Sequence, residues 1–174
     1  MGITLLAAGL AGCTPEEPLD PPTPAPSGSP VFASDEEALA AAEALYGEYL
    51  QAENALGAGG WQDLSLVEPF LRGAALEDEK ETATSFSSKG YHQVGDITFD
   101  STSLQSRDDG GSGSMSMTVY LCLDVAGADI LNSSGESVVT ADRPDRLALE
   151  VDIDDVEGQL EISRSEPWSG ADFC

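Results

Sequence analysis

The chain has very little positive charge. Among its 174 residues it has only 7 Lys and Arg against 32 Asp and Glu, and a single His. Such an excess of negative charge repels nucleic-acid phosphates and anionic lipid headgroups, which excludes both as electrostatic partners. The sequence also lacks a phosphate-binding loop, a nucleophile elbow and the ligand spacing of a zinc site. We therefore expect no nucleic-acid partner, no cofactor, no metal site and no catalytic residues.

Long apolar runs are missing as well. The apolar run over residues 3–11 is uncharged, is too short to span a bilayer and ends in small residues. It leads into Leu10-Ala11-Gly12-Cys13, which resembles the lipobox of bacterial lipoproteins. That resemblance implies that residues 1–12 are a signal peptide and that Cys13 carries a diacyl lipid. The protein would then be held to the outer face of the cytoplasmic membrane. Because residues 1–4 have none of the positive charge that opens a leader, we expect the full leader to be longer.

Residues 13–33 are predicted to form a tether between the lipid and a folded domain over residues 34–174. The stretch from 14 to 30 is rich in Pro and cannot bury a core, so it favours extended polyproline conformations. At about 3.1 Å per residue it would hold the domain roughly 50 Å from the anchor. The alternative interpretation is a proline-motif ligand for a partner protein.

The sequence has only three cysteines. With Cys13 acylated, Cys122 and Cys174 remain as a pair in an oxidising compartment, and we expect them to form a disulfide. Closing that loop would restrict the unfolded chain by roughly 4 kcal/mol. The alternative is two unrelated thiols, but a disulfide at the last residue would fasten a tail that otherwise frays.

The first part of the domain has helical periodicity. Ser34 and Glu37 form a capping box, and the apolar spacing that follows predicts a helix as far as Gly57. Tyr46 and Tyr49 lie on its apolar face, where core packing is a more common role than lining a pocket. Residues 66–72 form a shorter amphipathic segment, and a third helix is predicted over 74–87. In that helix Leu76, Ala83 and Phe86 would face inward, and residues 77–81 would be a solvated charge run.

Beyond Gly90 the pattern alternates. We predict a strand to about Leu104 with a bulge at Gly95, a flexible connection over 106–114, and a clear strand over 115–125 with Cys122 on its more polar side. A long connection over 127–145 has turns at Gly135 and Pro144, and a short strand is expected at 138–139.

Two further strands are predicted over 147–153 and around 160–162. Asp154 and Asp155 would form the turn between them. The tail over 166–174 would return to Cys122, where Trp168 and Phe173 would cover the polar side of the sheet.

Helices followed by a meander of antiparallel strands predict an α+β domain with helices packed on one face of a curved sheet. The domain resembles the nuclear-transport-factor-2-like cone, and in particular small secreted actinobacterial lipoproteins of unassigned function. The resemblance rests on the following features: the capped first helix with its two tyrosines, Gly73-Ala74-Ala75-Leu76, the strand over 119–125 with its Cys, the loop over 143–146, and Trp168 with the final Cys.

Enzymes of the cone fold place an acid or a His with a Tyr or a second acid in the pocket. His92, Asp96, Tyr120 and Asp124 are the candidates here, and they form no recognisable constellation. The acids at 152, 154, 155 and 157 lack the spacing of a calcium loop, so we interpret them as solvated turns. Arg143 and Arg146 are expected to pair with neighbouring acids.

These observations leave three classes of function. The leading one is a membrane-tethered domain that binds a small apolar ligand or a protein partner without catalysis. The alternatives are a small cone-fold enzyme of the isomerase or cyclase type and a structural envelope protein. A hollow cone with a buried acid would favour the enzyme, whereas a cone filled by its own side chains would favour contact with a protein.

Overall fold

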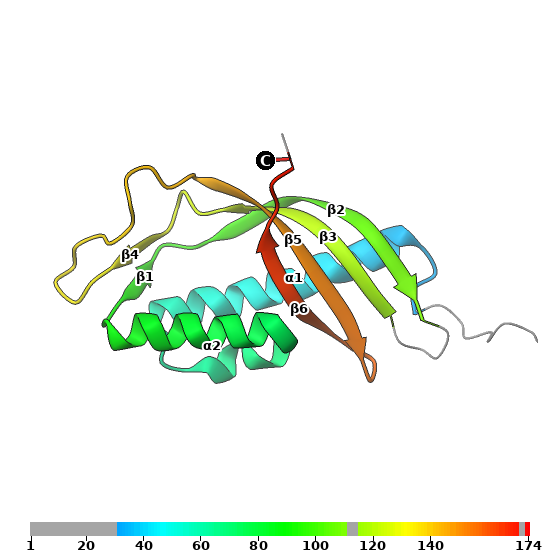
Figure 1. Cartoon of the computed structure of the whole chain (residues 1–174), viewed down its shortest axis with the longest axis horizontal. Coiled ribbons are helices and arrows are strands. Elements are labelled where there is room, and N and C mark those ends of the chain that lie inside the picture. Colours follow the sequence, from blue (N-terminus) through cyan, green and yellow to red (C-terminus); the bar gives the residue numbers. More distant parts are fainter. Residues whose placement is uncertain (1–30, 111–114, 171–172) are drawn as a thin grey trace, which may run out of the picture.

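The computed structural model describes residues 31–110, 115–170 and 173–174. Cys13, the predicted signal peptide and most of the predicted tether therefore lie outside the described residues. Within these residues two helices and two short 3-10 turns come first and the strands follow, so the predicted α+β class is confirmed. The helices pack on one face of a curved antiparallel sheet (Figure 1). No helix in the described part of the chain is both long and apolar enough to cross a membrane.

The first helix, α1 (Asp35–Ala58), begins at the predicted capping box. The Ser34 hydroxyl accepts a hydrogen bond from the Glu37 N–H at 3.3 Å. The Glu37 carboxylate returns a bond to the N–H of Ala33 at 2.8 Å, one residue earlier than the capping-box pattern places it. The helix ends where Gly60 adopts φ +71°, a left-handed conformation that glycine takes without strain.

The predicted amphipathic segment is correct in position but not in form. It folds as two 3-10 turns, η1 (Leu64–Leu66) and η2 (Glu68–Phe70), because Pro69 cannot continue a regular helix. Val67 and Leu71 are both buried, as the pattern predicts. The following N–H, that of Arg72, donates to the Ile162 carbonyl at 2.9 Å and joins this segment to the sheet. Helix α2 (Gly73–Ser88) then packs against the last strand of the sheet.

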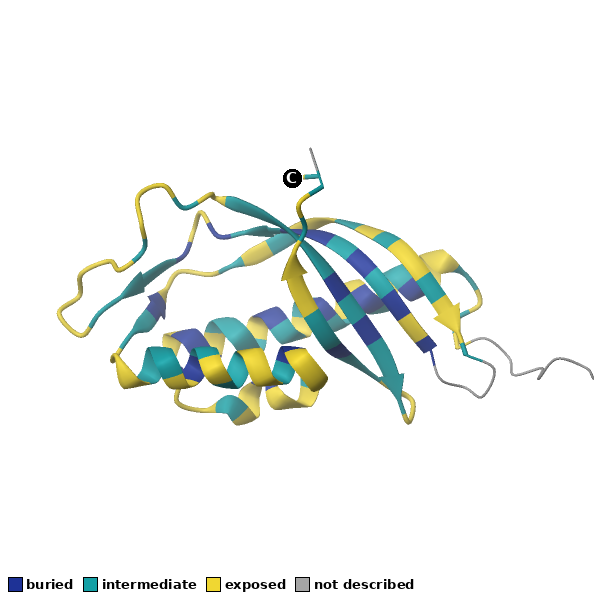
Figure 2. Cartoon of the chain, in the orientation of Figure 1, coloured by how far each residue is buried: buried dark blue, intermediate teal, exposed yellow. Residues whose placement is uncertain are grey.

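Four long strands make the main sheet, in the order β2-β3-β5-β6. They are β2 (Thr98–Asp109), β3 (Met115–Asp124), β5 (Arg146–Val156) and β6 (Gln159–Pro167). The predicted alternation in β3 is confirmed, since Met115, Met117, Val119 and Leu121 are buried against the helices. Figure 2 shows buried residues at intervals along β3, β5 and α1. The inner face and α1 fill most of the space between them with their own side chains.

The predicted bulge at Gly95 is instead a break between two strands. The short strand β1 (His92–Val94) pairs with β4 (Asp129–Leu131) in a separate two-stranded sheet, and β2 begins after the break. Asn54 of α1 holds the chain there, because its side chain bonds to both the N–H and the carbonyl of Ile97 at 2.9 Å. The buried Gln93 donates to the same Asn54 side chain at 2.7 Å. This amide network replaces the ladder bonds that a continuous strand would make.

Three other boundaries differ from the prediction. Strand β2 continues to Asp109, so the predicted connection begins later, and its residues 111–114 lie outside the described residues. The turn between β5 and β6 lies at Glu157 and Gly158, whose φ values of +56° and +88° are typical of a two-residue hairpin, and not at Asp154 and Asp155. The expected strand at 138–139 is absent from the described residues, where β4 and a single bridge to Ser137 stand in its place.

Candidate functional site

Helix α1 carries a carboxylate, Glu53, that points towards the inner side of the sheet and that the apolar pattern of the helix did not reveal. Glu53 follows Tyr46 and Tyr49 on the same helical face, at spacings of seven and four residues, so it points into the interior with them. The Oε2 atom of Glu53 is shielded from solvent and has no hydrogen-bond partner among the described residues. Burial of an unpaired carboxylate is costly, so this residue departs from ordinary core composition.

A second carboxylate reaches the same region from α2. Glu79 lies four residues from both Ala75 and Ala83, which are buried, so its side chain lies on the inner stripe of the helix. Its Oε1 atom is also shielded from solvent and has no partner among the described residues. The prediction that residues 77–81 form a solvated charge run is therefore wrong at Glu79, and it holds for its exposed neighbours Glu77, Asp78 and Glu81.

Trp61 faces this pair from the loop after α1. Its backbone has φ +55°, which is uncommon for a residue other than glycine, and its N–H donates to the Leu56 carbonyl at 2.9 Å. The side chain is only 5% exposed and packs edge-on against Phe86, with ring centroids 4.8 Å apart. The indole Nε1 is buried without a partner in hydrogen-bond geometry. It nevertheless favours the ionised form of Glu53, so the indole edge is directed at that carboxylate.

Burial and mutual repulsion change the protonation of these groups. Burial raises the pKa of Glu53 to about 8, and the negative charge of Glu79 contributes to the increase. Burial also raises the pKa of Glu79. The pKa of Tyr49 is raised well above its usual value by burial first, and then by Glu53, Glu79 and Tyr46. At neutral pH the cluster therefore holds Glu53 mainly in its protonated, neutral form.

A pocket of about 180 Å³ opens onto this cluster between α2 and β6. It is lined by one residue of α1, one that follows the 3-10 turns, four of α2 and two of β6, namely Tyr49, Leu71, Ala75, Asp78, Glu79, Thr82, Ile162 and Ser165. Tyr46 is plain core, as predicted, whereas Tyr49 also lines the pocket. The space between the helices and the sheet thus contains a packed apolar core, with a small pocket at the acidic cluster and an open groove between α1 and the start of β2.

None of the seven basic residues of the chain forms an ion pair with Glu53 or Glu79 in the described structure. Five pair with acids elsewhere, and Lys89 donates to Ser85 at 3.0 Å. The five are Arg72, Lys80, Arg107, Arg146 and Arg164. Arg143 departs from the prediction, because it bonds to the carbonyls of Val125 and Ala128, each at 2.8 Å, and not to an acid. The interior pair therefore has no cation of its own.

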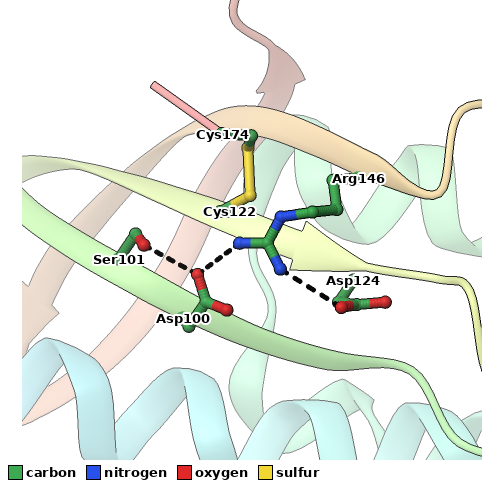
Figure 3. Close-up of a disulfide and its surroundings, with 6 residues drawn as sticks. All are labelled: Asp100, Ser101, Cys122, Asp124, Arg146 and Cys174. Carbon is green, nitrogen blue, oxygen red and sulfur yellow. Dashed lines mark hydrogen bonds and ion pairs between the residues drawn. A yellow bond between two sulfur atoms is a disulfide. The ribbon is translucent and has the colours of Figure 1, made fainter. Parts of the chain in front are cut away.

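The outer face of the sheet has a different construction. Cys122 and Cys174 are joined by a disulfide with their Cα atoms 5.5 Å apart, as the sequence predicts (Figure 3). Trp168 stacks on Tyr120 with ring centroids 4.3 Å apart, and Phe173 packs edge-on against both rings. The predicted cover of this face by the tail is confirmed.

Arginines organise the acids on the outer face. Arg146 bonds to Asp100 at 2.6 Å and to Asp124 at 3.2 Å, as Figure 3 shows, and its bond to Asp100 lowers the pKa of that carboxyl. Arg164 bonds to Glu150 and Asp152, each at 2.7 Å, and to Glu166 at 2.9 Å. These guanidinium groups neutralise the acids that surround them.

The polar residues singled out in the sequence do not meet. Asp124 is bound to Arg146, Tyr120 lies under Trp168, and His92 belongs to the separate β1-β4 sheet. Asp96 lines an open groove between α1 and the start of β2. Among the acids weighed as calcium ligands, Asp152 pairs with Arg164 and Asp154 with Arg72. The described residues contain no group of three or more side chains placed to hold a metal ion.

No protein-family model matches the sequence, and no curated protein matches it. The structure is similar to the intermembrane space region of the chloroplast protein ARC6, with 12% identity and a TM-score of 0.55 over 76% of this chain and 97% of that one. A periplasmic fragment of TraM (13% identity, TM-score 0.47, 78% and 98% covered) and Aln2 from a Streptomyces species (16%, 0.46, 78% and 92%) are more distant. At this identity the likeness to ARC6 shows the fold alone, an α+β domain with helices on a curved sheet.

Proposed function

We propose that the protein is an extracytoplasmic lipoprotein whose domain binds a small ligand without catalysis. Lipid on Cys13 holds it to the outer face of the bacterial cytoplasmic membrane, and its domain is a nuclear-transport-factor-2-like cone of the kind found in actinobacterial lipoproteins. The lipobox resemblance supports the anchor. The disulfide between Cys122 and Cys174 supports an oxidising compartment, because such bonds persist outside the cytosol.

The pocket at Tyr49 and Glu79 is the observation that carries the binding function. It lies between α2 and β6, and behind it are buried polar atoms without partners among the described residues. Buried polar groups are normally satisfied, so atoms left open beside a pocket favour a ligand that completes them. A cavity of about 150 Å³ accepts a molecule of the size of benzene, which sets the scale of the ligand.

Filling the pocket tests the binding function. Ala75→Phe places a ring in the pocket, and Ala44→Phe on the exposed side of α1 is the matched control. We expect benzene-sized amines, alcohols and amides, screened by amide chemical shifts, to include at least one compound that shifts Thr82 and Ile162. The response should be lost in Ala75→Phe and kept in Ala44→Phe. If no compound perturbs these residues in the native protein, the proposal is wrong.

Substitution of the predicted lipid-bearing residue tests the anchor. Cys13→Ala should release the protein into the medium or stall removal of its leader, whereas Cys174→Ala should leave it on the membrane. Intact mass measured on the membrane fraction should show the mass of a diacyl group. An unmodified Cys13 in that fraction would contradict lipid anchoring.

A cone-fold enzyme is the second candidate, and Glu53 favours it. A carboxyl with a pKa of about 8 beside Tyr49 can act as a general acid or base near neutral pH, because its pKa lies close to that pH. An enzyme of the isomerase or cyclase type would exchange the α-protons of small ketones with deuterium oxide, and Glu53→Gln would abolish that exchange. Binding without catalysis predicts exchange at the buffer rate in both proteins.

A further inference from the structure

The ligand of the pocket can be given a chemical class, on the condition that the proposed small-ligand function is correct. We propose that the pocket takes a small primary alkylammonium ion. Its ammonium group is held by the carboxyl group of Glu79 in the pocket wall, with the charge of Glu53 behind it, and its alkyl chain lies along Leu71 and Ile162.

The open polar atoms define what the ligand must offer. The Oε1 atom of Glu79, which lines the pocket, is a hydrogen-bond acceptor without a donor in the described structure, and the Oε2 atom of Glu53 has only the indole N–H of Trp61 directed at it. Trp61, which is only 5% exposed, directs its own unpartnered N–H at Glu53, so the cluster is built around a carboxylate and not around an anion from outside. A primary ammonium has donors for several acceptors at once and carries the opposite charge.

The remainder of the chain does not supply that charge. The basic residues are engaged elsewhere, as described above, and the domain has 29 acids against 7 bases once the three acids before residue 34 are set aside. A field of this sign concentrates cations at the surface and repels anions. A divalent metal ion fits less well, because calcium takes six or more oxygen ligands and the described residues offer no cluster of three.

The lining of the pocket also divides by polarity. Leu71, Ala75 and Ile162 make one apolar side, and Glu79 with Tyr49 makes the polar end. A ligand that matches both has a short alkyl chain and one cationic head. Within the volume of about 180 Å³ this corresponds to an amine of a few carbon atoms.

Binding of a cation should depend on pH. The groups that face Glu53 are Tyr46 and Tyr49 from α1, Glu79 from α2 and the indole of Trp61. Exposed Asp78 lies at the pocket rim, and the residues of β6 that line the pocket, Ile162 and Ser165, do not titrate. Of these groups, only the carboxyls of Glu53 and Glu79 change charge between pH 6 and pH 8.5. A bound cation should therefore displace a proton from this pair of carboxyls. Affinity should therefore rise by about tenfold or more between pH 6 and pH 8.5.

The test compares two molecules of nearly the same shape, propylammonium and 1-propanol. Each is titrated into the full chain, purified after export, and followed by amide chemical shifts and by calorimetry in buffers of different ionisation enthalpy. We expect saturable binding of propylammonium at Thr82 and Ile162 with release of a proton, and no binding of 1-propanol. At pH 8.5, where Glu53 is largely ionised, Glu53→Gln and Glu79→Gln should each weaken binding at least tenfold, whereas the exposed controls Glu48→Gln and Glu81→Gln should not.

The outcomes separate this inference from the proposed function. Binding of 1-propanol at the same residues with equal affinity would overturn the ammonium inference and leave a small-ligand pocket. Binding of propylammonium that survives both Gln variants would also overturn it. Failure of every compound to perturb the pocket would overturn the proposed function as well. Because Gln has the shape of Glu without its charge, the variants remain foldable and the comparison stays informative.

Discussion

The acids on the two faces of the same sheet have opposite surroundings: those on the outer face are paired with arginine, and those on the inner face are buried without a base in the described structure. On the outer face, Glu150, Asp152 and Glu166 surround Arg164 at hydrogen-bond distance. On the inner face, Glu53 and Glu79 lie together under the sheet with no base beside them in the described structure. The outer acids are therefore paired with a guanidinium group, whereas the inner pair is buried and burial disfavours its charge.

The difference shows where the few positive charges of this chain are used. An acidic sequence with seven bases can neutralise only some of its carboxylates, and the observed pairs hold the edges and the outer face together. A core position occupied by Glu in place of an apolar residue costs stability unless something compensates it. Departures of this kind are expected at functional sites, which is why the inner pair carries our proposals.

The largest effect should come from removing the covalent fastening of the outer face. Cys122→Ala combined with Cys174→Ala should lower the free energy of unfolding by about 4 kcal/mol, because the unfolded chain is no longer closed over 52 residues. Urea denaturation followed by circular dichroism measures this loss.

Fluorine NMR of the fluorotryptophan-labelled double variant then reports on the two faces separately, because Trp168 lies on the outer face and Trp61 on the inner one. The signal of Trp168 should change when the tail is released, and that of Trp61 should not. Ser116→Ala, an exposed change on the same strand as Cys122, serves as the control. Equal stability of the double variant and the native protein would contradict the prediction.

The second effect concerns the inner pair and depends on pH. The pKa of Glu53 is about 8 in the folded protein against an ordinary 4.5, so the unfolded chain loses this proton at a lower pH than the folded one. The contribution of Glu53 to stability is therefore most favourable below about pH 4.5 and is lost as the pH rises through 8. Glu53→Gln removes this loss, and we expect it to be more stable than the native protein by about 3 kcal/mol at pH 8.5.

The same comparison at pH 4.5 should show little difference between Glu53→Gln and the native protein. Glu48→Gln, an exposed change on the same helix, controls for the general repulsion among acids and should show little difference at either pH. A constant difference between Glu53→Gln and the native protein across this range would show that Glu53 keeps an ordinary pKa.

The smallest effect should follow from breaking the outer network. Arg164→Gln leaves three acids without their guanidinium, but the site is partly exposed and solvent screens the charges, so the loss should be about 1 kcal/mol. It should shrink at high ionic strength, because salt screens partly exposed charges. Urea denaturation of the two proteins at low and high salt measures the loss, and a loss independent of salt would point to packing and not to charge.

Local sequence patterns predicted the elements whose causes are local. The capping box at Ser34 and Glu37 located the start of α1, and the strict alternation around Val119 located β3. The break at Gly95 was missed because it depends on Asn54, 43 residues from Ile97 in the chain. Likewise, the hairpin turn was placed at two aspartates, although Glu157 and Gly158 have the backbone conformation that reverses the chain.

The candidate site was missed for a different reason. Glu53 and Glu79 both follow the helical spacing of buried residues, so periodicity alone placed them on the inner faces of their helices. Composition argued against that position, because glutamate is rarely buried, and an acidic run is usually solvated. The signal available in the sequence was a glutamate at the spacing of the buried apolar residues of its helix, which indicates a buried acid.

The disulfide also determines how the domain responds to mechanical load. Cys174 is bonded to Cys122 in β3, and β3 has a neighbouring strand on each side. A pull on the carboxyl end is therefore transmitted to the middle of the sheet and not to the edge strand β6. Peeling β6 away one hydrogen bond at a time would need little force, whereas extraction of β3 breaks two ladders together. The oxidised domain should thus resist forced extension far better than the reduced one.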